Sequence, residues 1–113
     1  MLNKVKASEL VIGSGRTAKF EGQGYGSGVS FFLVDNDPGQ GPDLHRHPYS
    51  ETWVVLEGTA VVTADGTDTL AEEGDILIVE GGTPHRFRAT GAGRLRMMCI
   101  HASPVFLQEN LGS

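Results

Sequence analysis

The stretch GQGPDLHRHPYSETWVVLEG, residues 39–58, is the most informative part of this chain of 113 residues. It contains a His-X-His pair, His45 and His47, followed by an acid, Glu51. Side chains two apart on an extended chain project from the same face, so both imidazoles can reach one ion. A straight strand would carry Glu51 roughly 20 Å from His45, so the chain must bend, and Pro48-Tyr49-Ser50 is the predicted bend. Imidazole and carboxylate are ordinary ligands of transition metals, so the stretch indicates a metal site.

The spacing within residues 39–58 resembles the first signature motif of the cupin superfamily without a gap. Five residues separate Gly39 from the His-X-His pair, three separate that pair from Glu51, and six lead on to Gly58. Residues 74–89 resemble the second motif in part, with Gly74, Gly82 and His85 at the expected offsets.

Two positions depart from the family pattern. Glu80 stands where the second motif has a proline, and Ala89 stands where it has an asparagine. Neither position is a metal ligand in that family. The departures therefore concern the rigidity of a turn and the contacts around the ligands, and they leave the ligand set complete.

Resemblance to cupins implies one all-β domain over residues 1–113, an antiparallel β-barrel of jelly-roll type. It also implies one divalent transition metal ion bound inside the barrel by His45, His47, Glu51 and His85. Four protein ligands would leave an octahedral ion with two open positions. The mixed ligand set suits iron, manganese, nickel or zinc and does not select among them. Small cupins usually dimerise, so a homodimer is expected, which would also protect an open sheet edge.

The rest of the chain has the pattern of a β-protein. Sixteen glycines and five prolines punctuate short stretches rich in Val, Ile, Phe and Thr, which is typical of a sandwich or barrel. No helix of ten or more residues is predicted; residues 106–111 could form a short turn, and the glycine-rich residues 22–28 are interpreted as a flexible loop. The predicted strands are Ala18–Gln23, Val29–Asp35, Glu51–Glu57, Thr59–Ala64, Ile76–Val79, His85–Thr90 and Arg94–His101.

Strand parity places the candidate ligands on inward faces. Arginines at positions 86, 88, 94 and 96 alternate with other side chains and are expected to face solvent. The opposite parity then turns inward His85, Phe87, Ala89, Leu95, Met97, Cys99 and His101. Trp53 and Val55 share the face of Glu51, and a barrel keeps its cavity on that side.

Composition excludes several classes of function. The formal net charge is −5 and no cluster of Lys or Arg stands out, so a nucleic-acid or anionic-membrane partner is not expected. Cys99 is the only cysteine, which rules out an intrachain disulfide and a thiolate zinc site. No apolar run approaches membrane-spanning length and the N-terminus has no apolar signal region, so a reducing, cytoplasmic location is expected.

Five other side chains are candidates around the metal. His101 is the candidate proton-transfer group because it faces inward at the end of a strand; as a barrel-end histidine it would instead bond to backbone. Tyr49 lies between the ligands, although a bend residue often points to solvent. Trp53 and Phe87 are expected to form the cavity wall, mainly as core packing. Cys99 is interpreted as a small buried hydrophobe and only secondarily as a reactive thiol.

Two kinds of chemistry are open to such a site. A redox metal could activate a catechol, enol or diketone toward dioxygen, and a Lewis-acid metal could assist isomerisation, decarboxylation or lyase chemistry. Dioxygenase chemistry on a small organic molecule is favoured slightly. The competing hypothesis is a non-catalytic cupin that binds or senses a metal or ligand. A catalytic site should face a cavity of roughly a few hundred Å³ that holds a positioned acid or base.

Overall fold

The computed structural model describes residues 1–112, so that only residue 113 of the expected domain lies outside it. Two 3-10 helical turns, η1 (Ala7–Leu10) and η2 (Gly22–Tyr25), lie near the N-terminus. Within the described range no helix is long and apolar enough to cross a membrane. The strands are β1 (Ala18–Phe20), β2 (Ser30–Asn36), β3 (His45–Arg46), β4 (Glu51–Glu57), β5 (Thr59–Ala64), β6 (Thr67–Ala71), β7 (Ile76–Val79), β8 (His85–Thr90), β9 (Leu95–His101) and β10 (Glu109–Asn110).

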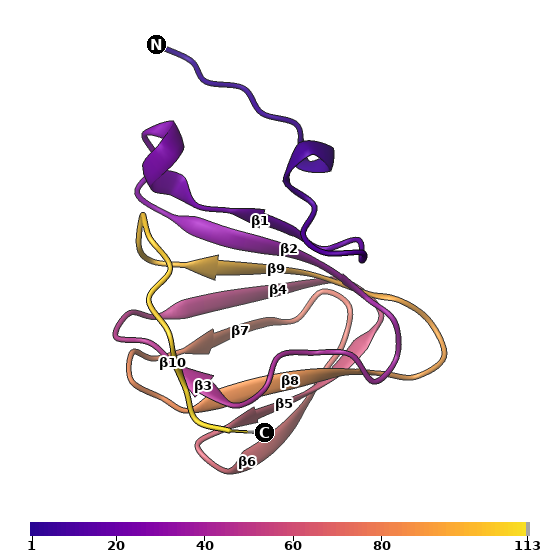
Figure 1. Ribbon diagram of the computed structural model, residues 1–113. Helices are drawn as coiled ribbons and strands as arrows, with labels where there is room; N and C mark the ends of the chain where they lie inside the picture. The colour runs from indigo at the N-terminus through magenta and orange to yellow at the C-terminus, as the bar shows by residue number, and fades with distance from the viewer. Residues whose placement is uncertain (113) are drawn as a thin grey trace.

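The strands form two antiparallel sheets of five strands each, stacked one above the other in Figure 1. The order is β1-β2-β9-β4-β7 in the first sheet and β10-β3-β8-β5-β6 in the second. Strands that follow one another along the chain, such as β2, β3 and β4, alternate between the sheets, as they do in a jelly roll. The predicted all-β, antiparallel jelly-roll fold is confirmed, as a barrel built of two sheets.

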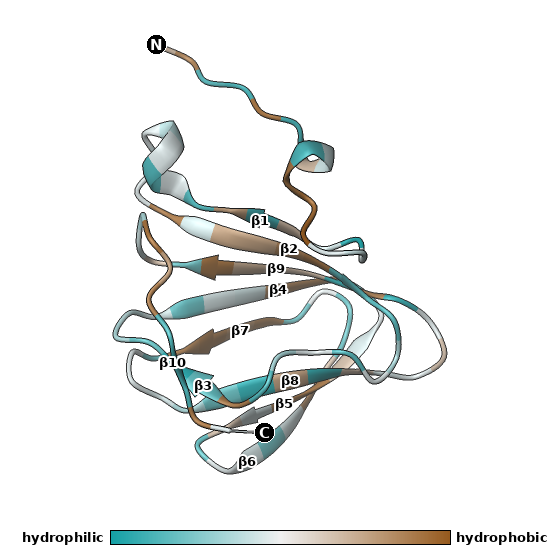
Figure 2. Cartoon of the chain, viewed as in Figure 1, coloured by the Kyte–Doolittle hydropathy of each residue, from teal (hydrophilic) through white to brown (hydrophobic). Residues whose placement is uncertain are grey.

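The core lies between the sheets and follows the predicted alternation. On β9 every second residue from Leu95 to His101 is buried, and on β8 the same holds from His85 to Ala89. Side chains from both sheets, among them Trp53 and Phe87, join one buried apolar cluster. Figure 2 shows hydrophobic colour along β7 and at the end of β9, while β3 is hydrophilic. Removal of this apolar surface from water is the main favourable term in folding.

Three short strands, β3, β6 and β10, are absent from the sequence prediction. Strand β6 is exposed at four of its five residues, so it carries no alternating apolar pattern. It pairs with β5 across a tight turn at Asp65 and Gly66, which both have positive φ values, 51° and 80°. An Asp-Gly turn after a strand signals a hairpin, and that signal could have predicted β6.

Two further expectations differ from the structure. The strand predicted over Ala18–Gln23 ends at Phe20, because the 3-10 turn η2 begins at Gly22, within the segment interpreted as a flexible loop. The backbone N–H of Gly22 donates to the hydroxyl of Ser30 at 3.0 Å. Residues 106–111 form no helical turn, because β10 pairs there with β3. We call residues 103–111 the C-terminal strap. In Figure 1 the strap runs from the end of β9 across one end of the barrel to β3.

Candidate metal centre

Strand pairing brings the candidate ligands together from distant parts of the chain. His45 on β3 lies directly opposite His85 on β8, and Glu51 on β4 lies directly opposite His101 on β9. The chain bends at Pro48 and Tyr49, as the spacing requires, and so carries the two sides of the motif into different sheets.

The turn between β7 and β8 holds this bend in place. The N–H of Gly82 donates to the carbonyl of His47 at 2.8 Å. At Gly81 an added Cβ would overlap the carbonyl oxygen of Pro48, so only glycine permits this approach. The absence of a proline at position 80 therefore does not prevent a close contact between the two motifs.

Each candidate histidine ligand is oriented by its own backbone. The Nδ1 atoms of His45 and His85 lie 2.7 Å from the carbonyls of Asp43 and Thr83, and that of His47 lies 2.8 Å from the carbonyl of Tyr49. A carbonyl oxygen can only accept, so each Nδ1 carries the proton. In the neutral ring each Nε2 then keeps a lone pair, which is the arrangement that metal-binding histidines adopt.

These Nε2 lone pairs gather around the carboxylate of Glu51. Its Oε1 lies 2.9 Å from Nε2 of His47 and 3.2 Å from Nε2 of His85. One ligand atom from each of His45, His47, Glu51 and His85 lies within 4.8 Å of all the others. Atoms bound to one ion at about 2.1 Å are at most about 4.2 Å apart. Small movements would therefore close this cluster around an ion.

The buried carboxylate and the imidazole nitrogens that face it need a positive charge between them, either a proton on a ring or a metal ion. Burial alone would raise the pKa of Glu51, but its contacts with His101, His47 and His85 hold that pKa well below its ordinary value, because a protonated imidazole donates to the carboxylate. Burial lowers the pKa of His45. At His47 burial is outweighed by hydrogen bonds to Glu51 and to the Tyr49 carbonyl, which raise its pKa. The anionic carboxylate and the converging imidazole nitrogens are the donor set that a divalent transition metal prefers.

The second oxygen of Glu51 is held by side chains outside the ligand set. Nε1 of Trp53 donates to Oε2 at 2.5 Å, and Nε2 of His101 lies 3.3 Å from the same oxygen. Nδ1 of His101 in turn lies 2.9 Å from the hydroxyl of Tyr49. Among residues 1–112, the His101 ring therefore makes polar contacts with these two side chains and with no backbone group. The Trp53 contact makes this residue more than the packing element that its type suggests.

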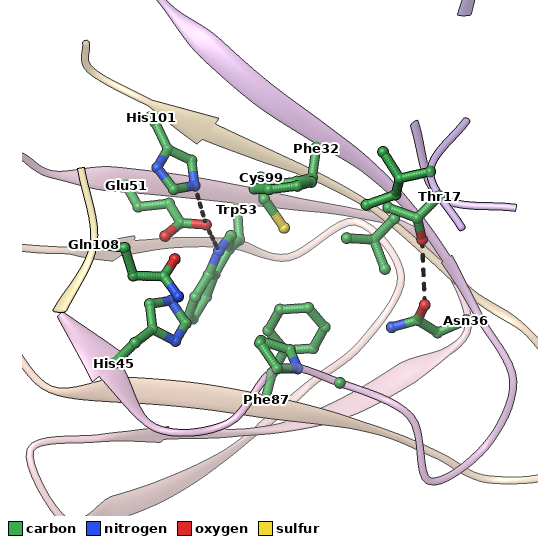
Figure 3. Close-up of a pocket in the computed structure, with 14 residues that line it drawn as sticks. Thr17, Phe32, Asn36, His45, Glu51, Trp53, Phe87, Cys99, His101 and Gln108 are labelled. Carbon is green, nitrogen blue, oxygen red and sulfur yellow. Dashed lines mark hydrogen bonds and ion pairs between the residues drawn. The ribbon is translucent and has the colours of Figure 1, made fainter. Parts of the chain in front are cut away.

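A cavity of about 370 Å³ adjoins the ligand cluster. Figure 3 shows Glu51, His45, His101 and Gln108 at one end, which we call the metal end, and Thr17 with Asn36 at the other, the far end. The wall between them is apolar and comprises Phe32, Val34, Trp53, Phe87 and Cys99. His47 and His85 do not line the cavity, so the ligand cluster presents only one side to it.

The remaining sequence candidates occupy different places around this cavity. Phe87 and Cys99 line it, and burial raises the pKa of the Cys99 thiol well above its ordinary value, so this cysteine is an unreactive wall residue. Tyr49 lies outside the lining. Its ring stacks on His47 with centroids 4.4 Å apart, and its hydroxyl contacts His101 and the strap residue Leu107.

Eight lining residues are absent from the site predicted from the sequence: Ile12, Thr17, Phe32, Val34, Asn36, Gly41, Pro42 and Gln108. Phe32 could have been found, because it has the inward parity of β2. Asn36 lies one residue beyond the predicted strand. Gln108 belongs to the C-terminal strap, which reaches the metal end because β10 pairs with β3, and nothing in its local sequence signals that contact.

Comparison with known proteins agrees with this architecture. The chain is 37% identical over 76 residues to the polyketide synthase CurC of Streptomyces cyaneus, a match that covers 66% of this chain and 49% of that protein. It is 34% identical over 61 residues to the HTH-type transcriptional regulator PuuR of Escherichia coli, covering 54% of this chain and 33% of the regulator. The chain thus spans about half or less of the length of these curated relatives.

A solved structure extends the likeness to the fold as a whole. A mutant of Bacillus subtilis oxalate decarboxylase OxdC, 21% identical, superposes with a TM-score of 0.75 over 84% of this chain and 27% of the other. The family model of the cupin domain matches residues 32–101, more than half of the chain, and includes all four candidate ligands. The chain therefore belongs to the cupin family.

Proposed function

We propose that this protein is a metal-dependent enzyme that acts on a small organic molecule, with dioxygenase chemistry favoured over isomerase, decarboxylase or lyase chemistry. One observation carries the proposal: three imidazole Nε2 atoms and one carboxylate converge beside a cavity of about 370 Å³, and two of these four ligands line it. That arrangement leaves one side of the cluster accessible to a substrate, which an active site needs.

The residues at the site suit a divalent iron, manganese, nickel or zinc ion. Such an ion, held by His45, His47, Glu51 and His85, would supply Lewis-acid polarisation or, for a redox metal, dioxygen chemistry. The protein supplies the rest. Backbone carbonyls fix the imidazole rings, and the Trp53 indole fixes the carboxylate. The apolar wall excludes water, so electrostatic interactions at the site are stronger than in solvent.

His101 is the proposed proton-transfer residue. It lines the metal end of the cavity, and its ring joins the Glu51 carboxylate to the Tyr49 hydroxyl. That hydroxyl lies within 3.3 Å of the backbone N–H and carbonyl of Leu107 on the C-terminal strap. A proton held by His101 would therefore be beside both a bound substrate and a hydrogen-bonded route toward the surface.

The second candidate function is a non-catalytic cupin that senses a metal or a small ligand. The match to PuuR, which is named as a transcriptional regulator, favours this alternative. A sensor needs no proton-transfer group at its metal. The position of His101 in the cavity lining therefore supports the enzyme hypothesis over the sensor hypothesis.

The test begins with elemental analysis of protein purified without an affinity tag or chelator. We expect about one equivalent of a transition metal in the wild type, little in Glu51→Ala, and full content in the matched surface variant Glu73→Ala, whose side chain is exposed. Dioxygen uptake by iron-loaded protein is then measured with a panel of catechols and diketones. His101→Gln should retain its metal yet turn over about 100-fold more slowly.

Each result discriminates between the hypotheses. Protein that binds no metal even when ions are added would exclude both enzyme mechanisms. Metal-loaded protein that consumes no dioxygen and converts none of the panel anaerobically would favour the sensor. Unchanged turnover in His101→Gln would remove this residue from the mechanism while leaving the metal proposal intact.

A further inference from the structure

The far end of the cavity is polar, in contrast to the wall that leads to it. Thr17 and Asn36 meet there, with the threonine hydroxyl 3.3 Å from Oδ1 of the asparagine. Figure 3 shows this pair at the opposite end from Glu51 and His101, with Phe32, Trp53 and Phe87 between.

The hydrogen bonds at this end leave one group free. The Thr17 hydroxyl donates to Oδ1 of Asn36 and accepts from the backbone N–H of Asp35 at 3.1 Å, so its single donor is used. No residue in the range 1–112 accepts a hydrogen bond from the Asn36 amide nitrogen. In Figure 3 this nitrogen points away from Thr17, toward the side of the cavity on which Phe87 lies. Asn36 therefore offers two donors to whatever occupies the cavity.

The two ends are well separated along the sheet. Ser30 on β2 lies opposite His101, and His101 lies opposite Glu51, so these three residues mark the level of the metal end. Asn36 lies six residues further along β2, a separation of roughly 20 Å between backbone levels. Phe32 and Val34, which share the inward parity of Asn36, line the path between the ends.

No cation serves the far end. None of the described residues that line the cavity is a lysine or an arginine. Two arginines line an adjoining polar groove, where Arg16 pairs with Asp35 and Asp37, and Arg88 pairs with Asp43. A carboxylate at the far end could accept from the Asn36 amide but its charge would lack a cationic partner in the cavity lining, whereas a neutral oxygen acceptor would need only the amide.

The far end is also where the cavity meets solvent. Ile12, Thr17, Asn36 and Gly41 line both the cavity and the polar groove. A ligand that enters from the groove would pass its leading group along the apolar wall toward the metal end. Its trailing group would come to rest beside Asn36.

We propose that the cavity takes an elongated ligand with an oxygen-bearing head, a flat apolar body and a neutral carbonyl or phenolic oxygen at its tail, and that Asn36 is the specificity-determining residue that binds the tail. This inference rests on the proposed function for the head group, since the head lies at the metal end. The aromatic side chains of Phe32, Trp53 and Phe87 contact the body. Asn36 selects ligands that carry an acceptor at the tail.

Binding of matched probes tests this inference without any turnover. The probes are 4-(4-acetylphenyl)catechol and 4-(4-isopropenylphenyl)catechol, which differ only in a terminal C=O or C=CH2. A longer version of each carries a second phenyl ring between the catechol and the terminal group. Affinity for zinc-loaded and for metal-free protein is measured by calorimetry and by quenching of Trp53, the single tryptophan of the chain. Of the two probe lengths, the one that binds more tightly is used for the comparison. At that length the wild type should bind the ketone about 3- to 10-fold more tightly than the alkene.

Variants assign the preference to Asn36. Asn36→Leu and the isosteric Asn36→Asp, which lacks the donors, should both lower the ketone-to-alkene ratio to about one or below. The matched control Asn3→Leu, on the N-terminal segment outside the cavity lining, should keep the wild-type ratio. Thermal melts confirm that each variant is folded.

The inference is overturned if the wild type shows no ketone preference, if neither probe binds, or if the ratio survives in both Asn36 variants. Zinc stoichiometry is measured on the same samples. Failure to bind zinc would contradict the proposed function. The preference for the ketone can still be measured in metal-free protein, so the two failures are distinguishable.

Discussion

At the metal end the ring of each of the three ligand histidines, His45, His47 and His85, is held by a carbonyl two residues away, whereas at the far end Asn36 is held by Thr17, nineteen residues earlier in the chain. The geometry of the ligands is therefore determined largely within short stretches of sequence. The far end is assembled from separate segments and depends on how they pack. A short motif can report a metal site in a distant relative, but it cannot report what the rest of the cavity recognises.

Two glycines allow the ends to be disturbed separately. At Gly81 a Cβ would overlap the carbonyl of Pro48, next to the ligands, and at Gly41 it would overlap the carbonyl of Phe87, at the far end. We expect Gly81→Ala and Gly41→Ala each to lower the free energy of unfolding by about 1–3 kcal/mol, because the backbone must move to admit the methyl group. Only Gly81→Ala should also weaken zinc affinity. Urea unfolding and chelator competition measure the two effects.

The controls for this pair come from the same chain. At Gly24 and Gly93 an added Cβ would have no neighbouring atom within 4 Å, and neither glycine has a left-handed φ. Alanine at either position should therefore change the free energy of unfolding by less than about 0.5 kcal/mol. Equal loss of zinc affinity in Gly81→Ala and Gly41→Ala would show that the two ends of the cavity are mechanically coupled. It would contradict the view that the metal end is determined locally.

The same distinction explains what the sequence could predict. His45, His47, Glu51 and His85 were accessible from spacing, and strand parity correctly placed Trp53, Phe87, Cys99 and His101 inside. Parity says which face a residue occupies but not which atom it touches. The bonds from Trp53 and His101 to the carboxylate, and the Thr17–Asn36 pair, join residues from different strands or depend on side-chain rotamers. No local pattern encodes such contacts.

The Trp53 bond to Glu51 is a contact at the metal end that spacing did not reveal, and its loss should be measurable. Trp53→Phe keeps an aromatic wall but removes the indole N–H that donates to Oε2 of Glu51. Loss of a partner that orients a ligand should weaken zinc affinity about 10-fold. Phe87→Leu, which alters the same wall without touching Glu51, is the matched control and should leave the affinity nearly unchanged. Equal losses would mean that wall packing, and not the hydrogen bond, supports the carboxylate.

The smallest effect is expected at the far end, where an ion-pair cluster lies beside Thr17 and Asn36. Arg94 and Arg16 both hydrogen-bond to Asp35, and they hold the pKa of that carboxyl below its ordinary value. A lowered pKa in the folded protein stabilises it above the unfolded pKa of about 3.9, and this contribution disappears as the pH falls through the folded value. Both arginines are nearly half exposed, so Asp35→Asn should cost only about 0.5–1 kcal/mol at pH 7.

Urea unfolding of the wild type and Asp35→Asn between pH 3 and pH 7 measures this contribution. The difference in unfolding free energy should be constant from about pH 5 upward and should shrink below about pH 4, because protonation of Asp35 abolishes the charge that the variant lacks. Added salt should reduce it at pH 7, since the pairs are open to solvent. The absence of any difference between the wild type and Asp35→Asn at every pH would mean that the Asp35 backbone contact with Thr17, which the variant keeps, and not the charge of Asp35, holds the far end together. The far end would then resemble the metal end, where backbone groups set the geometry.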